Sequence, residues 1–232
     1  MQQVFYVAYG SNLDRQRFAC YLQGGRAPGA QRTLPGSRDH SPPRADVPTT
    51  LGHRLRFASG SPSWGGGVAF VDPQAEADVA TLGRAWLVSV PQAADVLAQE
   101  NGWDPAGAGA LTNAIERAHH DGLAVVDPGG RYGAVVALAD IDGQPAVTFT
   151  SPVPAAPTAP PDAAYLGVIA RGLAEAHALD ADAVVEYLSG APGIAGRLDD
   201  DALSQRVSTG STRDDPDPPG PAHPPTGAQR RS

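Results

Sequence analysis

One carboxylate lies where the helical pattern of the sequence would place an apolar side chain. Residues 91–100 are predicted as a helix with an apolar face formed by Ala93, Val96 and Leu97. Glu100 is the next position on that face. Burial and the C-terminal end of a helix both raise the pKa of a carboxyl group. Such a group is suited to general acid–base catalysis near neutral pH. The alternative is a frayed helix end that lets Glu100 reach solvent.

A second candidate site is the loop between the first predicted strand and the first predicted helix. It reads Tyr9, Gly10, Ser11, Asn12 and Leu13. The glycine permits a tight turn and a close approach of ligand to backbone. The serine, with an acid three residues later, resembles a helix capping box. Free N–H groups at the start of a helix attract a carboxylate or an oxyanion. The alternative is an ordinary strand–turn–helix connection with a Ser or Asn cap.

Other residues offer weaker chemistry. Gly66 and Gly67 lead into a predicted strand, where glycine indicates that something approaches the backbone closely, so both are candidate substrate-binding positions. The alternative is a flexible entry loop.

Adjacent His119 and His120 point in different directions on a helix, and no cysteine or paired acidic motif completes a metal site. We therefore predict no metal at these histidines. Residues 199–201, three aspartates, are interpreted as a solvated helix start.

The composition excludes several kinds of chemistry. The chain of 232 residues contains no lysine, so its 17 basic residues are all arginine, and lysine Schiff bases and P-loop lysines are excluded. Its single cysteine, Cys20, cannot form an internal disulfide. A net charge of −8 argues against non-specific binding to nucleic acid or to an anionic membrane. No apolar run approaches the 18 residues of a membrane helix. We expect a cytoplasmic protein, either monomer or homodimer.

One domain is expected over residues 1–206, with a long Pro/Gly-rich loop at 24–50, followed by a disordered tail at 207–232. Predicted strands are short and bounded by Gly or Pro: Val4–Ala8, Arg54–Ala58, Val68–Val71, Leu82–Val88, Gly133–Ala139 and Ala146–Phe149. Predicted helices are Asp14–Leu22, Pro91–Glu100, Leu111–Ala118, Tyr165–Leu173 and Ala181–Leu188. Because strands and helices do not alternate regularly, the pattern predicts an α+β fold or a small mixed β-barrel flanked by helices.

Together these features resemble the gamma-glutamylcyclotransferase-like family. The matching blocks follow the family order over about residues 4–190. They are the strand entering the Tyr9–Leu13 loop, the glycine-led strand at 64–70, the Trp86 strand, the helix ending at Glu100 and the helix containing Tyr165.

This resemblance implies a small mixed β-barrel flanked by helices, a substrate-binding Tyr9–Leu13 loop and Glu100 as the catalytic acid/base. It also implies a small-molecule substrate with a free α-amino and carboxylate group, and a reaction that requires no metal and no cofactor. The α-amine of a γ-glutamyl group would attack its own γ-carbonyl and release 5-oxoproline and a free amine. Two positions depart from the family pattern. Asn101 separates Glu100 from Gly102, and Phe149 stands where relatives often have a tyrosine, a hydroxyl that Tyr132 could supply.

Two other functions remain open at this point. A non-catalytic module could use the same pocket to bind a carboxylated metabolite. A metal-assisted amide hydrolase, such as a deacetylase, could use His119 or His120.

Overall fold

The central strand of the molecule is buried on both faces. In the computed structural model, which describes residues 1–60 and 64–211, β1 (Gln3–Ala8) lies inside a mixed six-stranded sheet of order β2-β5-β1-β8-β7-β6. It pairs antiparallel with β5 (Thr81–Ser89) and parallel with β8 (Gln144–Thr150). The other strands of this sheet are β2 (Ala45–Leu51), β6 (Leu123–Val125) and β7 (Ala134–Ile141). A second, two-stranded sheet pairs β3 (His53–Gly60) with β4 (Gly67–Ala75).

Alternation along β1 divides the core into two parts. Val4, Tyr6 and Ala8 belong to one apolar cluster, while Phe5 and Val7 belong to the other. Successive side chains of a strand point to opposite faces of the sheet, so one strand supplies both clusters. The turn that follows β1 therefore lies where the two clusters meet.

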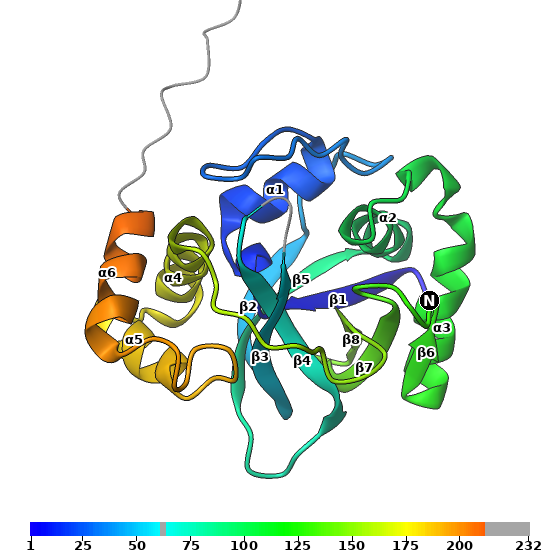
Figure 1. Cartoon of the computed structure of the whole chain (residues 1–232). Helices are drawn as coiled ribbons and strands as arrows, with labels where there is room; N and C mark the ends of the chain where they lie inside the picture. Colours follow the sequence, from blue (N-terminus) through cyan, green and yellow to red (C-terminus); the bar gives the residue numbers. More distant parts are fainter. Residues whose placement is uncertain (61–63, 212–232) are drawn as a thin grey trace, which may run out of the picture.

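Helices cover both sides of the sheets (Figure 1). One side carries α4 (Ala163–His177), α5 (Ala181–Ser189) and α6 (Asp200–Ser211), and the other carries α2 (Val90–Glu100) and α3 (Gly109–Asp121). The short α1 (Arg15–Gln23) follows a 3-10 turn, η1 (Ser11–Leu13), and a second such turn, η2 (Pro105–Gly107), precedes α3. This arrangement confirms the predicted α+β class, with mixed strands flanked by helices. The strands form two separate hydrogen-bonded sheets, so the barrel is not closed among the described residues.

The predicted loop at 24–50 contains a strand that the sequence pattern hides. β2 begins at Ala45, and it carries Pro48 in its middle. Proline cannot donate to a sheet ladder, which argues against a central strand but is tolerated at an edge. β2 is the edge strand next to β5, so the proline is accommodated there.

The last helix extends past the expected end of the domain at residue 206. α6 continues to Ser211, and Val207 is buried at 2% exposure in the apolar cluster that contains α4. The predicted tail therefore begins later than residue 207, because one buried valine and the helix before it hold this segment on the core. The remaining part of the predicted tail, 212–232, lies outside the described residues.

Candidate active site

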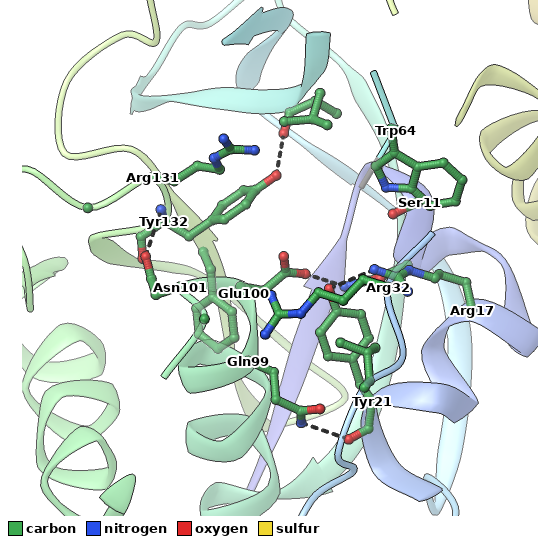
Figure 2. Close-up of a pocket in the computed structure, with 18 of the residues that line it drawn as sticks. Ser11, Arg17, Tyr21, Arg32, Trp64, Gln99, Glu100, Asn101, Arg131 and Tyr132 are labelled. Atoms are coloured by element: carbon green, nitrogen blue, oxygen red, sulfur yellow. Dashed lines mark hydrogen bonds between the residues drawn. The ribbon is translucent and has the colours of Figure 1, made fainter. Parts of the chain in front are cut away.

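A cavity of about 370 Å³ opens where the two apolar clusters meet. Its walls come from the turn after β1, the C-terminal end of α2, the turn before β7 and the long segment before β2 (Figure 2). Tyr9, Gly10, Ser11, Asn12 and Glu100 all line it. The structure therefore brings together the glutamate and four of the five loop residues that the sequence singles out. Leu13, the fifth, is 1% exposed and packs in the core without lining the cavity.

The helix that carries Glu100 is defined at both ends. At its start, Ser89 and Gln92 form a reciprocal capping box, and Pro91 occupies the first turn. Glu100 is its last residue. The Asn12 amide donates a hydrogen bond to Glu100 Oε1 at 2.8 Å. The glutamate therefore turns into the cavity towards the loop after β1, instead of fraying into solvent.

Opposing effects set the proton affinity of Glu100. Burial is the largest of them and raises the pKa of the carboxyl above its ordinary value. The nearby Arg17 guanidinium and hydrogen bonds from the Tyr21 hydroxyl and the Asn12 amide favour the ionised form and limit the rise. The result is a carboxyl group with a raised pKa that still has three polar partners. This combination is typical of a general acid–base residue.

The loop after β1 is held in place by side chains that donate hydrogen bonds to its carbonyl groups. The indole N–H of Trp86 donates to the Asn12 carbonyl at 2.9 Å, and Arg84 donates to the Leu13 carbonyl at 3.0 Å. Arg84 is 2% exposed and forms ion pairs with Asp46 and Glu175. This arginine lies behind the loop and does not line the cavity. It therefore holds the loop from outside the cavity.

The capping arrangement of this loop differs from the expected one. Asp14, not Ser11, caps α1, and its carboxylate accepts from the Arg17 N–H at 2.7 Å. Ser11 instead begins the 3-10 turn that lines the cavity. A 3-10 turn is common at a helix start, and it shifts the cap by one turn along the chain.

Gly10 lies where its neighbours leave little room for a side chain. A Cβ atom there would lie 3.0 Å from both Ala69 Cβ and the Tyr165 hydroxyl oxygen. That hydroxyl accepts from the Ala69 N–H at 3.1 Å and is also hydrogen-bonded to Ser11. Burial raises the pKa of Tyr165 to about 12, so its hydroxyl stays protonated at neutral pH. Tyr165 therefore contributes a polar group to the inner wall of the cavity.

Arg17 is a buried cation in the cavity wall. It is 6% exposed, and its Nε and one terminal nitrogen have no hydrogen-bond partner in the described part of the chain. The other terminal nitrogen donates to the Tyr21 hydroxyl at 3.1 Å. The guanidinium lies over the rings of Tyr21 and Trp64, at 4.8 and 5.6 Å from their centroids. An incompletely paired buried guanidinium favours anionic groups in the cavity.

The two positions that depart from the family pattern both contribute to the site. The Asn101 side chain donates to the Tyr132 carbonyl at 3.1 Å and accepts from the Tyr132 N–H at 3.2 Å. The Tyr132 hydroxyl donates to the Ala69 carbonyl at 3.1 Å, so its proton is already engaged. Phe149 lines the cavity and stacks on Tyr6 at 4.8 Å. The residue after Glu100 thus anchors the opposite wall.

Gly66 and Gly67 do not line the cavity. A Cβ atom on Gly66 would lie 2.6 Å from the Asp162 nitrogen, and one on Gly67 would lie 2.2 Å from the Ala159 oxygen. Another backbone segment does approach these glycines closely, as their sequence pattern indicates. The segment is 159–162, however, so we place the two glycines in the packing of β4 and outside the proposed site.

The candidate metal ligands lie apart from the cavity. His119 and His120 occupy the last turn of α3, the His120 side chain is 87% exposed, and neither residue lines the cavity. Among the described residues, no group of three or more His, Cys, Asp or Glu side chains is arranged to hold a metal ion. Asp199 accepts from the Ala202 N–H, and the aspartates that follow begin α6, as the sequence predicts.

Several residues of the cavity were not among the site residues predicted from the sequence. They are joined to the site only by the fold: Arg17, Tyr21, Arg32, Trp64, Gln99, Arg131 and Tyr165. Tyr165 is separated from Ala69 by 96 positions along the chain, for example. One signal in the sequence is the spacing of four between an arginine and a tyrosine on α1, which puts Arg17 and Tyr21 on one helix face.

Similarity to known proteins is partial. No protein-family model matches the sequence. The chain is 34% identical over 198 residues to a curated protein of Arabidopsis thaliana named Histone deacetylase 5; the match covers 80% of this chain. The chain spans 30% of that relative's length. Among solved structures it is similar to a gamma-glutamyl cyclotransferase, with a TM-score of 0.44, and to an uncharacterized Homo sapiens protein, with a TM-score of 0.43. Each is 16% identical, with 90% of this chain and 99% of the other covered.

None of the helices in the described ranges, 1–60 and 64–211, combines the length and the apolar character needed to cross a membrane.

Proposed function

We propose that the chain is an amide-cleaving cyclotransferase that acts on a γ-glutamyl amine or dipeptide and releases 5-oxoproline and a free amine. The observation that carries this proposal is the Glu100 carboxyl, which faces the cavity while Asn12 and Tyr21 hold it. The substrate supplies its own nucleophile, so the protein must fold the substrate into attack geometry and move one proton.

The reaction requires two proton transfers at one carboxylate. The substrate α-amine attacks the γ-carbonyl carbon, and Glu100 accepts a proton from that amine as the new C–N bond closes the five-membered ring. The tetrahedral intermediate then collapses, the bond to the leaving nitrogen breaks, and Glu100 returns the proton to that nitrogen. A carboxyl with a raised pKa serves both steps, because it binds a proton firmly enough to take it and releases it again.

Other cavity residues have complementary parts in this proposal. The loop Tyr9–Asn12 offers backbone N–H groups for the carboxylate or the developing oxyanion of the substrate. Arg17 supplies a buried positive charge beside the same wall. Tyr165 and Trp64 give that wall its shape, with ring centroids 5.2 Å apart. All the steps use groups of this chain and of the substrate.

The test is 5-oxoproline release from γ-glutamyl-alanine, followed by mass spectrometry. We expect Glu100→Gln to lower kcat/KM by about 10²–10⁴-fold, the usual contribution of an acid–base residue. The matched control is Glu186→Gln on the exposed face of α5. A thermal melt checks the fold of both variants; Glu100→Gln should melt no lower than wild type at neutral pH, because burial disfavours the charged form of Glu100. Equal 5-oxoproline release by wild type and Glu100→Gln would remove Glu100 from the mechanism.

A second candidate function is deacylation. The name of the Arabidopsis thaliana relative raises this function, but the chain spans 30% of that relative, the histidines at the end of α3 lie apart from the cavity, and no group of three metal-ligating side chains is found among the described residues. An acetyl-lysine peptide in the same assay separates the two functions. Acetate release that a chelator abolishes would support the metal-assisted hydrolase. γ-Glutamyl-alanine that binds and is recovered unchanged would instead support a non-catalytic binding module.

A further inference from the structure

One loop beside the cavity connects the two apolar clusters. Residues 25–34, which we call the strap, follow α1 and contribute Arg32 and Leu34 to the cavity lining. Leu34, at the end of the strap, belongs to the cluster that contains α2. Ala27 and Ala30 belong to the cluster that contains α4. The strap therefore spans the junction of the two clusters, where the cavity opens.

The two ends of the strap are joined to each other and to α2, and they form a neck. Gly25 and Leu34 exchange both backbone hydrogen bonds, at 3.0 and 2.7 Å. Just after the strap, the Gly36 N–H donates to the Gln99 side chain of α2 at 3.3 Å. Gly24 and Gly25 have φ angles of +79° and +112°, which glycine adopts without strain. The neck is therefore a fixed point about which the rest of the strap can turn.

The tip of the strap, residues 26–33, is held by apolar contact alone. It forms no hydrogen bond or ion pair with the rest of the described chain. Its two buried alanines are 1% and 7% exposed. A Cβ atom built on Gly29 would lie 3.5 Å from Ala164 Cβ of α4 and 3.8 Å from the Trp64 ring. Such small residues pack closely and give up little apolar area when they separate, so the tip can leave α4 at low cost.

With its tip on α4, the strap completes the cavity wall between α2 and α4. Arg32 and Leu34 line the cavity together with Trp64, which the tip contacts. Figure 2 shows Arg32 reaching from the strap into the cavity that Glu100 lines. An enclosed site keeps bulk water away from a proton in transfer, and it must open for substrate entry and product release. The tip, held without hydrogen bonds, is the part of this wall that is suited to open.

We propose that the tip of the strap opens to admit substrate and release product, and closes on Trp64 and Ala164 while Glu100 transfers the proton. The neck stays on α2 in both states, so the motion is a turn of the tip about the neck. This inference rests on the proposed cyclotransferase function for the reaction that the strap encloses. The strap itself takes no part in the chemistry.

A removable cross-link between the tip and α4 tests this motion. The double variant Gly29→Cys/Ala164→Cys, made in a Cys20→Ser background, places two thiols on Cβ atoms 3.5 Å apart, which a disulfide can bridge. Diamide should form the disulfide and lower kcat/KM for γ-glutamyl-alanine by about tenfold or more, because a locked strap keeps substrate out. Dithiothreitol should restore the activity. Thiol titration measures the cross-link.

The matched control is Gly29→Ser/Ala164→Ser in the same background. It carries the same strain at the positive φ of Gly29 and has no thiols. Its activity should respond to neither reagent. Equal kcat/KM for the oxidised and reduced forms of the cysteine variant overturns the inference. Failure of the two thiols to pair also overturns it, because the tip then does not lie on α4.

Trypsin tests the opening in wild type without any measurement of activity. This lysine-free chain is cut only after arginine; Arg26 and Arg32 lie in the strap, and Arg197 lies in an exposed turn elsewhere. Cleavage after Arg26 and Arg32 should be at least as fast as after Arg197, and the disulfide should slow it about tenfold without affecting Arg197. Strap sites that are cut later than Arg197 in wild type overturn the opening. Absence of 5-oxoproline from every form of the protein instead overturns the proposed function, and the order of cleavage still decides whether the strap opens.

Discussion

At the scale of single residues, Glu100 is controlled through a short chain of contacts that begins on α1. Arg17 donates to the Tyr21 hydroxyl, and that hydroxyl is hydrogen-bonded to Glu100. The guanidinium therefore favours the ionised carboxylate both through space and through the tyrosine. Because Arg17 itself is buried, water does little to screen this interaction. Arg17 therefore acts through Glu100, as a positioning residue that stabilises the ionised form of its carboxyl group.

This contact chain predicts the pH dependence of activity. Glu100 must be ionised to accept the amine proton, so kcat/KM falls as the pH drops through the pKa of Glu100. Arg17→Gln removes a cation that lowers this pKa, so the acidic limb of the profile should move to higher pH. Tyr21→Phe should move it in the same direction by less, since Tyr21 is the smaller influence. The measurement is kcat/KM for γ-glutamyl-alanine against pH.

A surface arginine provides the comparison for that profile. Arg54 pairs with Glu76 on the outside of the molecule, so Arg54→Gln should leave the acidic limb in place. A loss of activity in Arg17→Gln with no movement of the limb would mean that the arginine only shapes the pocket. A limb that moves to lower pH would contradict the electrostatic role outright.

At the scale of elements, α2 contributes to the site in two ways. Its last residue is Glu100, and one of its faces holds the long segment before β2 through three buried polar side chains, Gln92, Asp95 and Gln99. Asp95 accepts from the Arg38 N–H at 2.8 Å and pairs with the Arg38 guanidinium. The spacing of three and four residues places the three side chains on one face of the helix. The segment that carries Arg32 is thereby fixed to the helix that carries Glu100.

Gln99 is the point at which this docking can be tested. Its amide donates to the Tyr21 carbonyl at 2.9 Å and accepts from the Gly36 N–H at 3.3 Å. Gln99→Leu leaves the Gly36 N–H without this acceptor and removes one of two donors to the Tyr21 carbonyl, which still accepts from the Ser37 hydroxyl at 3.0 Å; the loss should cost about 1–3 kcal/mol of unfolding free energy. Trypsin cleaves this lysine-free chain only at arginine, so the variant should be cut faster after Arg26 and Arg32. Denaturant unfolding and timed proteolysis measure the two effects.

Gln16→Leu, on the exposed side of α1, is the matched change for this experiment. It should alter neither the unfolding free energy by more than about 0.5 kcal/mol nor the order of cleavage. If Gln99→Leu is cut at the same sites and rates as wild type, the segment is held by its other contacts.

Elements with strong local signals could be predicted from the sequence. α2 has an apolar face and a proline in its first turn, and Asp142-Gly143, a typical hairpin pair, joins β7 to β8 with positive φ at both residues. β2 was hidden by Pro48, because the sequence alone does not reveal that this strand would lie at an edge. β6 has three residues and two exposed apolar side chains, too little pattern to identify.

The residues of the site also divide into those that have a local signal in the sequence and those that do not. Glu100 breaks a helical pattern, and the turn after β1 has an unusual composition, so both stood out as single features. Arg17, Arg131 and Tyr165 are ordinary residues in their own elements, and only the packing of distant segments brings them to one cavity. The glycines before β4 show the opposite case. Their pattern indicates a close approach, but only the fold identifies the neighbour as backbone.

At the scale of the whole molecule, the cavity depends on how closely α4 packs on the turn after β1. This helix belongs to the cluster on one side of β1, and Glu100 is carried by a helix on the other side. Gly172 of α4 lies directly against the turn Ser11–Leu13. A Cβ atom at this position would lie 2.4 Å from Leu13 Cβ and 2.5 Å from the Asp14 nitrogen. The contact involves backbone, so a change of rotamer cannot relieve it.

Gly172→Ala should therefore move α4 away from the turn after β1 and disturb the cavity between α4 and the helix that carries Glu100. Alanine favours a helix over glycine by about 1 kcal/mol, so propensity alone predicts a more stable protein. Overpacking costs about 1–3 kcal/mol and should dominate here, lowering both the melting temperature and the kcat/KM for γ-glutamyl-alanine. Gly109→Ala is the control, because Gly109 also lies in a helix and a Cβ atom there meets nothing within 4 Å. That variant should be as stable as wild type or more so. If Gly172→Ala matches it in stability and activity, close packing of α4 on the turn is not what holds the cavity together.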